Sequence, residues 1–163
     1  MQTNTTRAAT KPVSRPGKAA AQKLLTSALP LMKAPPVNLG IICEWLNILV
    51  YIMPCGAFGA IFSKRAGGGH LLQVNSRLPL GRFRFSIAHE LGHFLQGHKP
   101  LASIWEKRSP FLERQADVFA AELLLPEELL RADRAAYTDD ELLERYKVSR
   151  QTLSIQLEEL KLR

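Results

Sequence analysis

The residues of this sequence that could do chemistry lie in one run of five, His89-Glu90-Leu91-Gly92-His93. On a helix, positions four apart share one face, so His89 and His93 project side by side. Two imidazoles placed in this way can hold one zinc ion at a Zn–N distance of about 2.0–2.1 Å. Glu90 lies about 100° around the same helix, within reach of a metal-bound water. The run therefore predicts a Zn²⁺ site for hydrolysis, in which the metal lowers the pKa of water and the carboxylate takes its proton.

The alternative to a metal site is an exposed polar stripe, because two histidines and one glutamate also fall in this register by chance. The surrounding residues favour a mostly buried helix, since many are apolar: Phe83, Phe85, Ile87, Leu91, Phe94 and Leu95. Buried imidazoles and carboxylates need partners, which a metal supplies. Gly92 costs a helix about 1 kcal/mol relative to alanine, so we expect another segment to approach closely there.

A catalytic zinc site needs a third protein ligand and an open fourth position. The elongated motif that ends in a third histidine fails here, since its last glycine and histidine would each be one position out of place. On the next expected helix, Glu113 and Asp117 share one face, whereas Glu122 lies on the opposite side. We therefore predict Glu113 as the third ligand and Asp117 as the partner of a ligand imidazole N–H. The alternative is that both are surface acids that pair with Arg114 or Arg131.

The elements that must position these residues are short and mixed in type. We expect a helix over 38–47, strands over 48–53, 56–64 and 70–75, and helices over 84–96, 111–125 and 126–136. This order predicts an α+β fold with a small antiparallel sheet and a pair of helices at the active site. The strand over 70–75 could pair with an extended substrate by strand addition.

Two blocks of this sequence together resemble the ImmA/IrrE family of metallo-endopeptidases. The first block is Arg84-Phe85-Ser86-Ile87-Ala88-His89-Glu90-Leu91-Gly92-His93-Phe94. The second is Glu113-x-x-Ala116-Asp117-x-Phe119-Ala120-Ala121-x-Leu123-Leu124-Leu125-Pro126. Both blocks occur in the same order as in the family, and the resemblance covers about residues 36–130.

The resemblance implies a zincin-like fold of the gluzincin kind. It implies that His89, His93 and Glu113 bind zinc and that Glu90 is the general base. It also implies a cytoplasmic protein of bacteria or mobile elements that cleaves a regulatory protein, often a helix-turn-helix repressor encoded nearby.

Charge and composition divide the chain into three expected parts. The 163 residues carry a net charge of +7, but residues 1–43 contain six basic residues and no acidic one, so the remainder is close to neutral. We expect residues 1–35 to be a disordered basic tail, with a short helix over Ala19–Leu29 as the alternative for that stretch. We expect 36–135 to be a zinc metallopeptidase domain and 136–163 a helix-turn-helix-like segment. A basic tail is weak evidence that the folded part binds nucleic acid.

Two cysteines and the lack of an apolar leader predict a soluble cytoplasmic protein. Residues 45–63 carry no charge, but Asn47, Pro54, Gly56 and Gly59 interrupt them. Two short buried strands explain this run better than a membrane-spanning helix. We therefore expect no membrane partner.

The last segment has the pattern of a helix-turn-helix. Its turn would be Lys147-Val148-Ser149, with Ser149 as the N-cap of the second helix. The residues that would read DNA are Arg150, Gln151, Ser154 and Gln156. The segment has no excess of basic residues, so we favour a helical pair that packs on the protease body or docks the substrate protein, with direct DNA binding as the alternative.

Three functional hypotheses follow from these residues. The first is a zinc endopeptidase that inactivates a regulatory protein. The second is a regulator that keeps the metal but acts by binding protein or DNA without hydrolysis, and the third is a toxin-like partner of an antitoxin. Glu90 separates the first two, because only hydrolysis needs its carboxylate. Further candidates near the reaction are Tyr137 and Tyr146 for the oxyanion, and His98 beside the metal.

Overall fold

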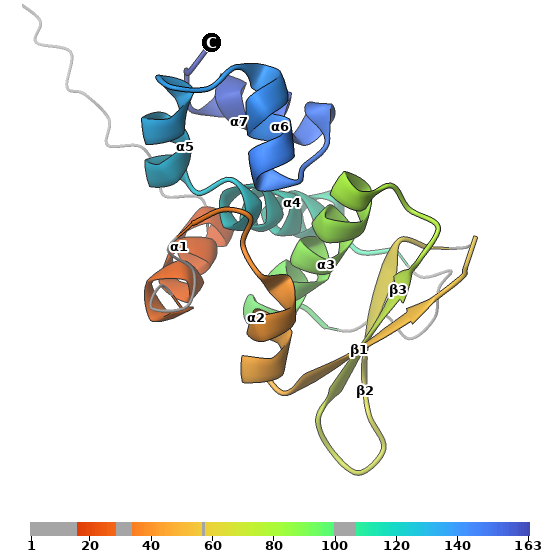
Figure 1. Cartoon of the computed structure of the whole chain (residues 1–163). Helices are drawn as coiled ribbons and strands as arrows, with labels where there is room; N and C mark the ends of the chain where they lie inside the picture. The colour runs from red at the N-terminus through yellow and green to blue at the C-terminus, as the bar shows by residue number, and fades with distance from the viewer. Residues whose placement is uncertain (1–15, 29–33, 57, 100–106) are drawn as a thin grey trace, which may run out of the picture.

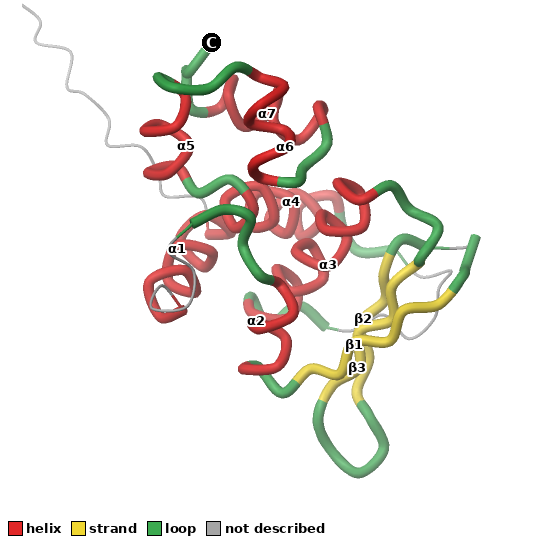
Figure 2. Tube along the Cα trace, viewed as in Figure 1, coloured by secondary structure: helices red, strands yellow, loops and turns green. Residues whose placement is uncertain are grey.

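The computed structural model describes residues 16–28, 34–56, 58–99 and 107–163. Over these residues the chain forms seven helices and three strands, arranged as shown in Figures 1 and 2. In chain order they are α1 (Pro16–Ala28), α2 (Leu39–Trp45), β1 (Ile48–Met53), β2 (Ala60–Lys64), β3 (His70–Asn75), α3 (Leu80–Leu95), α4 (Pro110–Leu124), α5 (Glu127–Arg134), α6 (Asp139–Tyr146) and α7 (Arg150–Glu159). The fold is α+β, as predicted, with the sheet at one end and α5, α6 and α7 at the other (Figure 1).

Strand β3 lies at the centre of the sheet, between β1 and β2. It pairs antiparallel with β2, where Phe62 lies opposite Leu72, and parallel with β1, where Ile48 lies opposite His70. The prediction of an antiparallel sheet is therefore wrong for the β1–β3 pair. The reason is that Leu72 and Val74 of β3 are fully buried, which favours the central position with a neighbour on each side.

The tight turn between β2 and β3 explains why only these two strands are antiparallel. The turn includes Gly67, Gly68 and Gly69 with φ values of 86°, 100° and 80°, a region that residues with a side chain rarely adopt. Because β3 has a neighbour on both sides, it has no free edge, and the predicted pairing of substrate with this strand is wrong.

The uncharged run over 45–63 contains β1 and the start of β2, as expected. However, β1 lies at the edge of the sheet and is not buried, since Leu49, Tyr51 and Ile52 are each more than half exposed. Within the described parts of the chain, no helix has the length and apolar character needed to cross a membrane.

Helices α3 and α4 pack against each other at the centre of the molecule (Figure 1). Helix α3 begins at Leu80, four residues before the predicted start. The close approach expected at Gly92 is confirmed, because a Cβ atom there would lie only 3.0 Å from Cδ1 of Phe119. The absence of a side chain at Gly92 thus lets the two helices approach closely.

Helix α1 corrects the predicted N-terminal tail. The prediction of disorder over 1–35 is wrong for residues 16–28, which form a helix packed on α4. The apolar residues Ala21, Leu24 and Leu25 lie at helical spacing and are buried, and this burial offsets the entropy lost on ordering. Residues 1–15 and 29–33 lie outside the described residues.

The C-terminal helices have the turn expected of a helix-turn-helix. Lys147 has a left-handed conformation with φ of 54°, and Ser149 caps α7 by accepting a hydrogen bond from the Thr152 N–H. However, Gln156 is buried and donates a hydrogen bond to Glu122 of α4, so the prediction that it reads DNA is wrong. The division of the chain at residue 136 stays a prediction, and the buried core runs through both parts.

Candidate metal centre

Helices α3 and α4 bring the three predicted ligands together. The Nε2 atoms of His89 and His93 are 3.0 Å apart. The carboxylate of Glu113 lies against both, with Oε2 at 3.2 Å from Nε2 of His89 and Oε1 at 3.4 Å from Nε2 of His93. Helices α3 and α4 therefore present three donor atoms to one point, and these atoms all lie within 4.8 Å of one another.

The chemistry of this donor set fits a zinc ion. Zinc prefers nitrogen and oxygen donors in a tetrahedral arrangement, in which donor atoms about 2.0–2.1 Å from the ion lie about 3.4 Å from each other. The separations of 3.0–3.4 Å in this cluster agree with that geometry. Three protein donors would leave a fourth position open, which is the pattern of catalytic rather than structural sites.

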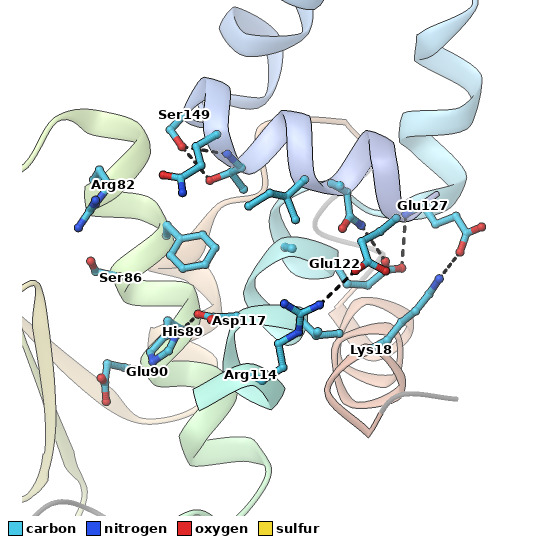
Figure 3. Close-up of a pocket in the computed structure, with 18 of the residues that line it drawn as sticks. Lys18, Arg82, Ser86, His89, Glu90, Arg114, Asp117, Glu122, Glu127 and Ser149 are labelled. Carbon is cyan, nitrogen blue, oxygen red and sulfur yellow. Dashed lines mark hydrogen bonds and ion pairs between the residues drawn. The ribbon is translucent and has the colours of Figure 1, made fainter. Parts of the chain in front are cut away.

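Asp117 lies one turn beyond Glu113, where the sequence predicted a partner for a ligand imidazole. The Nδ1–H group of His89 donates a hydrogen bond of 2.9 Å to Oδ1 of Asp117 (Figure 3). This bond leaves the lone pair of Nε2 directed toward the cluster. Burial lowers the pKa of His89. The hydrogen bond to Asp117 and the negative charges of Glu90, Asp117 and Glu113 raise it by more, so the pKa of His89 lies above its ordinary value.

His93 has a different support, formed by a second histidine and an amide. Its Nδ1 lies 2.8 Å from Nδ1 of His98, and Nε2 of His98 lies 3.1 Å from Oε1 of Gln115. Because an amide oxygen only accepts, Nε2 of His98 donates to Gln115, which leaves Nδ1 of His98 to accept from Nδ1–H of His93. Burial lowers the pKa of His93 to about 3, with the charges of His89, Arg108 and His98 acting in the same direction, so this imidazole is neutral.

Glu90 lies beside the cluster without contributing a donor to it. The residue is 8% exposed, and among the described residues nothing forms a hydrogen bond with its Oε2 atom. Burial raises the pKa of Glu90, although the charges of His89 and Arg108 lower it in part. A buried carboxylate with an unused acceptor next to three donor atoms has the geometry expected of a general base.

Arg108 is the residue at this centre that the sequence reasoning missed. Its side chain is 7% exposed, and its guanidinium lies 3.9 Å from both Oε2 of Glu90 and Oε1 of Glu113. A buried cation thus faces both carboxylates of the centre. The available signal was its position just before the Ser109 N-cap of α4, five residues before Glu113.

The two tyrosines considered for the oxyanion are engaged elsewhere. The hydroxyl of Tyr146 is buried and donates to Oδ2 of Asp133. The ring of Tyr137 lies under the guanidinium of Arg145, 4.9 Å from its centroid. Both side chains are therefore engaged by partners outside the metal centre, and the structure favours neither for that role.

Glu122 lies on the opposite side of α4 from Glu113, as predicted, but it is a buried polar contact between helices. Its carboxylate accepts hydrogen bonds from Gln22 of α1, from Gln156 of α7, and from the backbone N–H of Glu127 at the start of α5. Four helices therefore meet at one side chain, which holds α1 and α7 against α4.

Comparison with known proteins places the fold in one family. Residues 43–158 match the peptidase family M78, described as the IrrE N-terminal-like domain. A solved Mycobacterium tuberculosis transcriptional regulator is similar to this chain, with a TM-score of 0.63 and 23% identity over 86% of this chain and 46% of that chain. This chain therefore spans about half the length of that protein, and the likeness shows the fold alone. None of the curated proteins compared with the chain matches it. Because the family match covers more than half of the sequence, the chain belongs to the family of IrrE N-terminal-like domains.

Proposed function

We propose that this protein is a zinc-dependent endopeptidase that cleaves a regulatory protein, of the helix-turn-helix repressor kind. The observation that carries the proposal is the convergence of His89, His93 and Glu113 beside a buried carboxylate with an unused acceptor atom. Membership of a metallopeptidase family supports the same activity.

In this proposal each residue of the centre has one role. His89, His93 and Glu113 would hold the zinc ion, which when bound would polarise the scissile carbonyl and lower the pKa of the attacking water. Glu90 accepts a proton from that water and then donates it to the leaving amine. The raised pKa of Glu90 suits this exchange, because a base that titrates nearer to neutral pH can also act as an acid. Arg108 stabilises the negative charge that develops on the carbonyl oxygen, since a buried cation acts strongly at low dielectric.

The regulatory substrate and the cytoplasmic location are part of the same proposal. They are supported by the family and by the solved relative, which is itself a transcriptional regulator.

The test compares three forms of the protein in host cytosol: wild type, Glu90→Gln, and Glu44→Gln as an exposed control on α2. New protein N-termini are identified by mass spectrometry, and bound zinc is measured for each purified form. We expect one regulatory protein to be cut by wild type and Glu44→Gln but not by Glu90→Gln, with equal zinc in all three. Identical N-termini in all three forms, together with a partner that binds each of them, would instead favour a regulator that acts without hydrolysis.

A further inference from the structure

A cleft of about 890 Å³ opens on the metal centre and continues well beyond it. His89 and Glu90 line its inner end, and α4 contributes Val118 and Ala121 further along. Helix α3 lines one side, with Phe85 among its residues. Helix α7 lies across from α3 (Figure 3) and lines the cleft along most of its length, from Gln151 to Glu159. The cleft therefore adjoins the metal centre on the side of His89 and Glu90.

Helix α7 presents one distinct stripe of side chains to the cleft. Leu153 and Leu157 are buried in the core on another side of the helix. Gln151, Ile155 and Glu159 are spaced four residues apart, so they share one face, and all three line the cleft. Ile155 is 45% exposed, which makes it a large apolar side chain left open in the middle of this stripe.

The wall of the cleft that α7 forms is held in place at two points. At one end, a Cβ atom on Gly81 of α3 would lie 2.5 Å from the backbone nitrogen of Ser149, so the backbones of α3 and the α7 cap are in direct contact. Further along α7, Gln156 donates to Glu122 and to the carbonyl of Leu125. The wall is therefore preformed, and a ligand loses little free energy to ordering it.

The chemistry of the lining favours a polypeptide over a nucleic acid. Its middle is apolar, where Ile155, Phe85 and Val118 contribute. Its outer part carries both signs of charge, and the exposed cation of Arg114 is paired with Glu159 at 3.2 Å. Carboxylates that line the cleft would repel the phosphate backbone of a nucleic acid. A polypeptide fits this lining, because it combines apolar side chains with a polar, uncharged backbone.

We propose that this cleft binds the substrate polypeptide on one side of the scissile bond and selects a large apolar side chain there through Ile155. The inference rests on the proposed peptidase function. It assigns α7, the second helix of the helix-turn-helix-like segment, to the recognition of a protein substrate. The substrate class is a polypeptide segment with a bulky apolar residue near the cleaved bond.

The test uses the full zinc-loaded chain and a library of peptides from bacterial cytosol digested with a Glu-specific protease, which leaves internal Lys and Arg intact, with cleavage sites read by mass spectrometry. The variants are Ile155→Glu and, as a matched control, Ile52→Glu, which replaces an isoleucine that is 56% exposed on β1. We expect wild type and Ile52→Glu to share a preference for Leu, Ile, Phe or Met at one position beside the cut. In Ile155→Glu that preference falls at least five-fold and moves toward Lys and Arg, while the circular dichroism spectrum and zinc content stay unchanged. An unchanged preference in Ile155→Glu would overturn the inference.

A second arm separates the inference from the proposed function. The same peptides are tested for binding to zinc-loaded Glu90→Gln, with and without Ile155→Glu. If no form cleaves peptides but Glu90→Gln binds apolar ones at least five-fold more tightly than the double variant, the cleft assignment holds and the peptidase function is wrong. Cleavage that depends on Glu90 but not on Ile155 retains the peptidase and removes the cleft assignment. The absence of both cleavage and Ile155-dependent binding also overturns it.

Discussion

Nδ1 of His93 lies 2.8 Å from Nδ1 of His98, so one imidazole fixes the orientation of another at the metal centre. His98 is fixed in turn by Gln115 of α4, at 3.1 Å. The other histidine of the cluster, His89, is supported differently, by the carboxylate of Asp117. The two imidazoles therefore present Nε2 to the same point through two independent hydrogen-bond supports.

Loss of His98 should weaken metal binding without removing a ligand. We expect His98→Ala to lower zinc affinity about 10–100-fold, because His93 then loses the acceptor that fixes its ring. His98→Asn should restore part of this affinity, since its side-chain oxygen can accept from Nδ1–H of His93. Competition with a chromophoric chelator measures the affinity, and His70→Ala on β3 is the control. Equal affinities for wild type and His98→Ala would contradict this prediction.

Removal of the buried cation should slow the reaction while the metal stays bound. We expect Arg108→Met to lower kcat on the identified substrate about 10²–10³-fold, as when one stabilising donor is removed from an oxyanion site. KM should change much less, because the developing charge exists only in the transition state. Arg108→Lys should recover part of kcat, since it keeps the charge but loses the planar group. A fall confined to KM would show that Arg108 binds the substrate instead.

The local part of the metal centre could be predicted from the sequence. Helical spacing alone places His89 and His93 on one face, and the same rule separates Glu113 from Glu122. Strand β1 and strand β3 were also predicted with the boundaries found, because Gly and Asn residues mark their ends. Each of these features depends on residues close together in the chain.

The features that the sequence did not predict depend on contacts between distant segments. The position of β3 between β1 and β2 follows from how the sheet packs on the helices, which no local pattern encodes. Arg108 is an ordinary loop arginine in the sequence, and only the packing of α3 on α4 places it 3.9 Å from Glu90. A short helix over Ala19–Leu29 was only an alternative to disorder, because its burial depends on packing against α4, which is distant in the sequence.

A side chain at Gly92 should force the two central helices apart. We expect Gly92→Ala to lower the free energy of unfolding by about 1–3 kcal/mol, because the new methyl would lie 3.0–3.1 Å from three atoms of Phe119. The steric cost of the new methyl group should exceed the gain of about 1 kcal/mol that alanine brings in helix propensity, so the net change is a loss of stability. Denaturant unfolding measures the change, with Gly56→Ala as a control because no atom lies within 4 Å of its added Cβ. If Gly92→Ala were as stable as wild type, the contact with Phe119 would not limit the helix spacing.

Deprotonation of Glu122 should make the protein less stable as pH rises from mild acid toward neutral. Burial raises the pKa of Glu122 above the ordinary glutamate value of 4.5, although the Gln22 and Glu127 hydrogen bonds and the charge of Lys18 lower it in part. The folded state therefore binds the proton more tightly than the unfolded state does. This contribution is fully present below pH 4.5 and is lost as pH rises through the folded pKa. We expect wild type to lose stability relative to Glu122→Gln as pH rises from 4.5 through the folded pKa of Glu122. The compared quantity is the difference between their free energies of unfolding. Urea unfolding between about pH 4 and pH 7 measures the difference, and a curve that rises with pH would mean that the Gln22 and Gln156 hydrogen bonds outweigh the cost of burial.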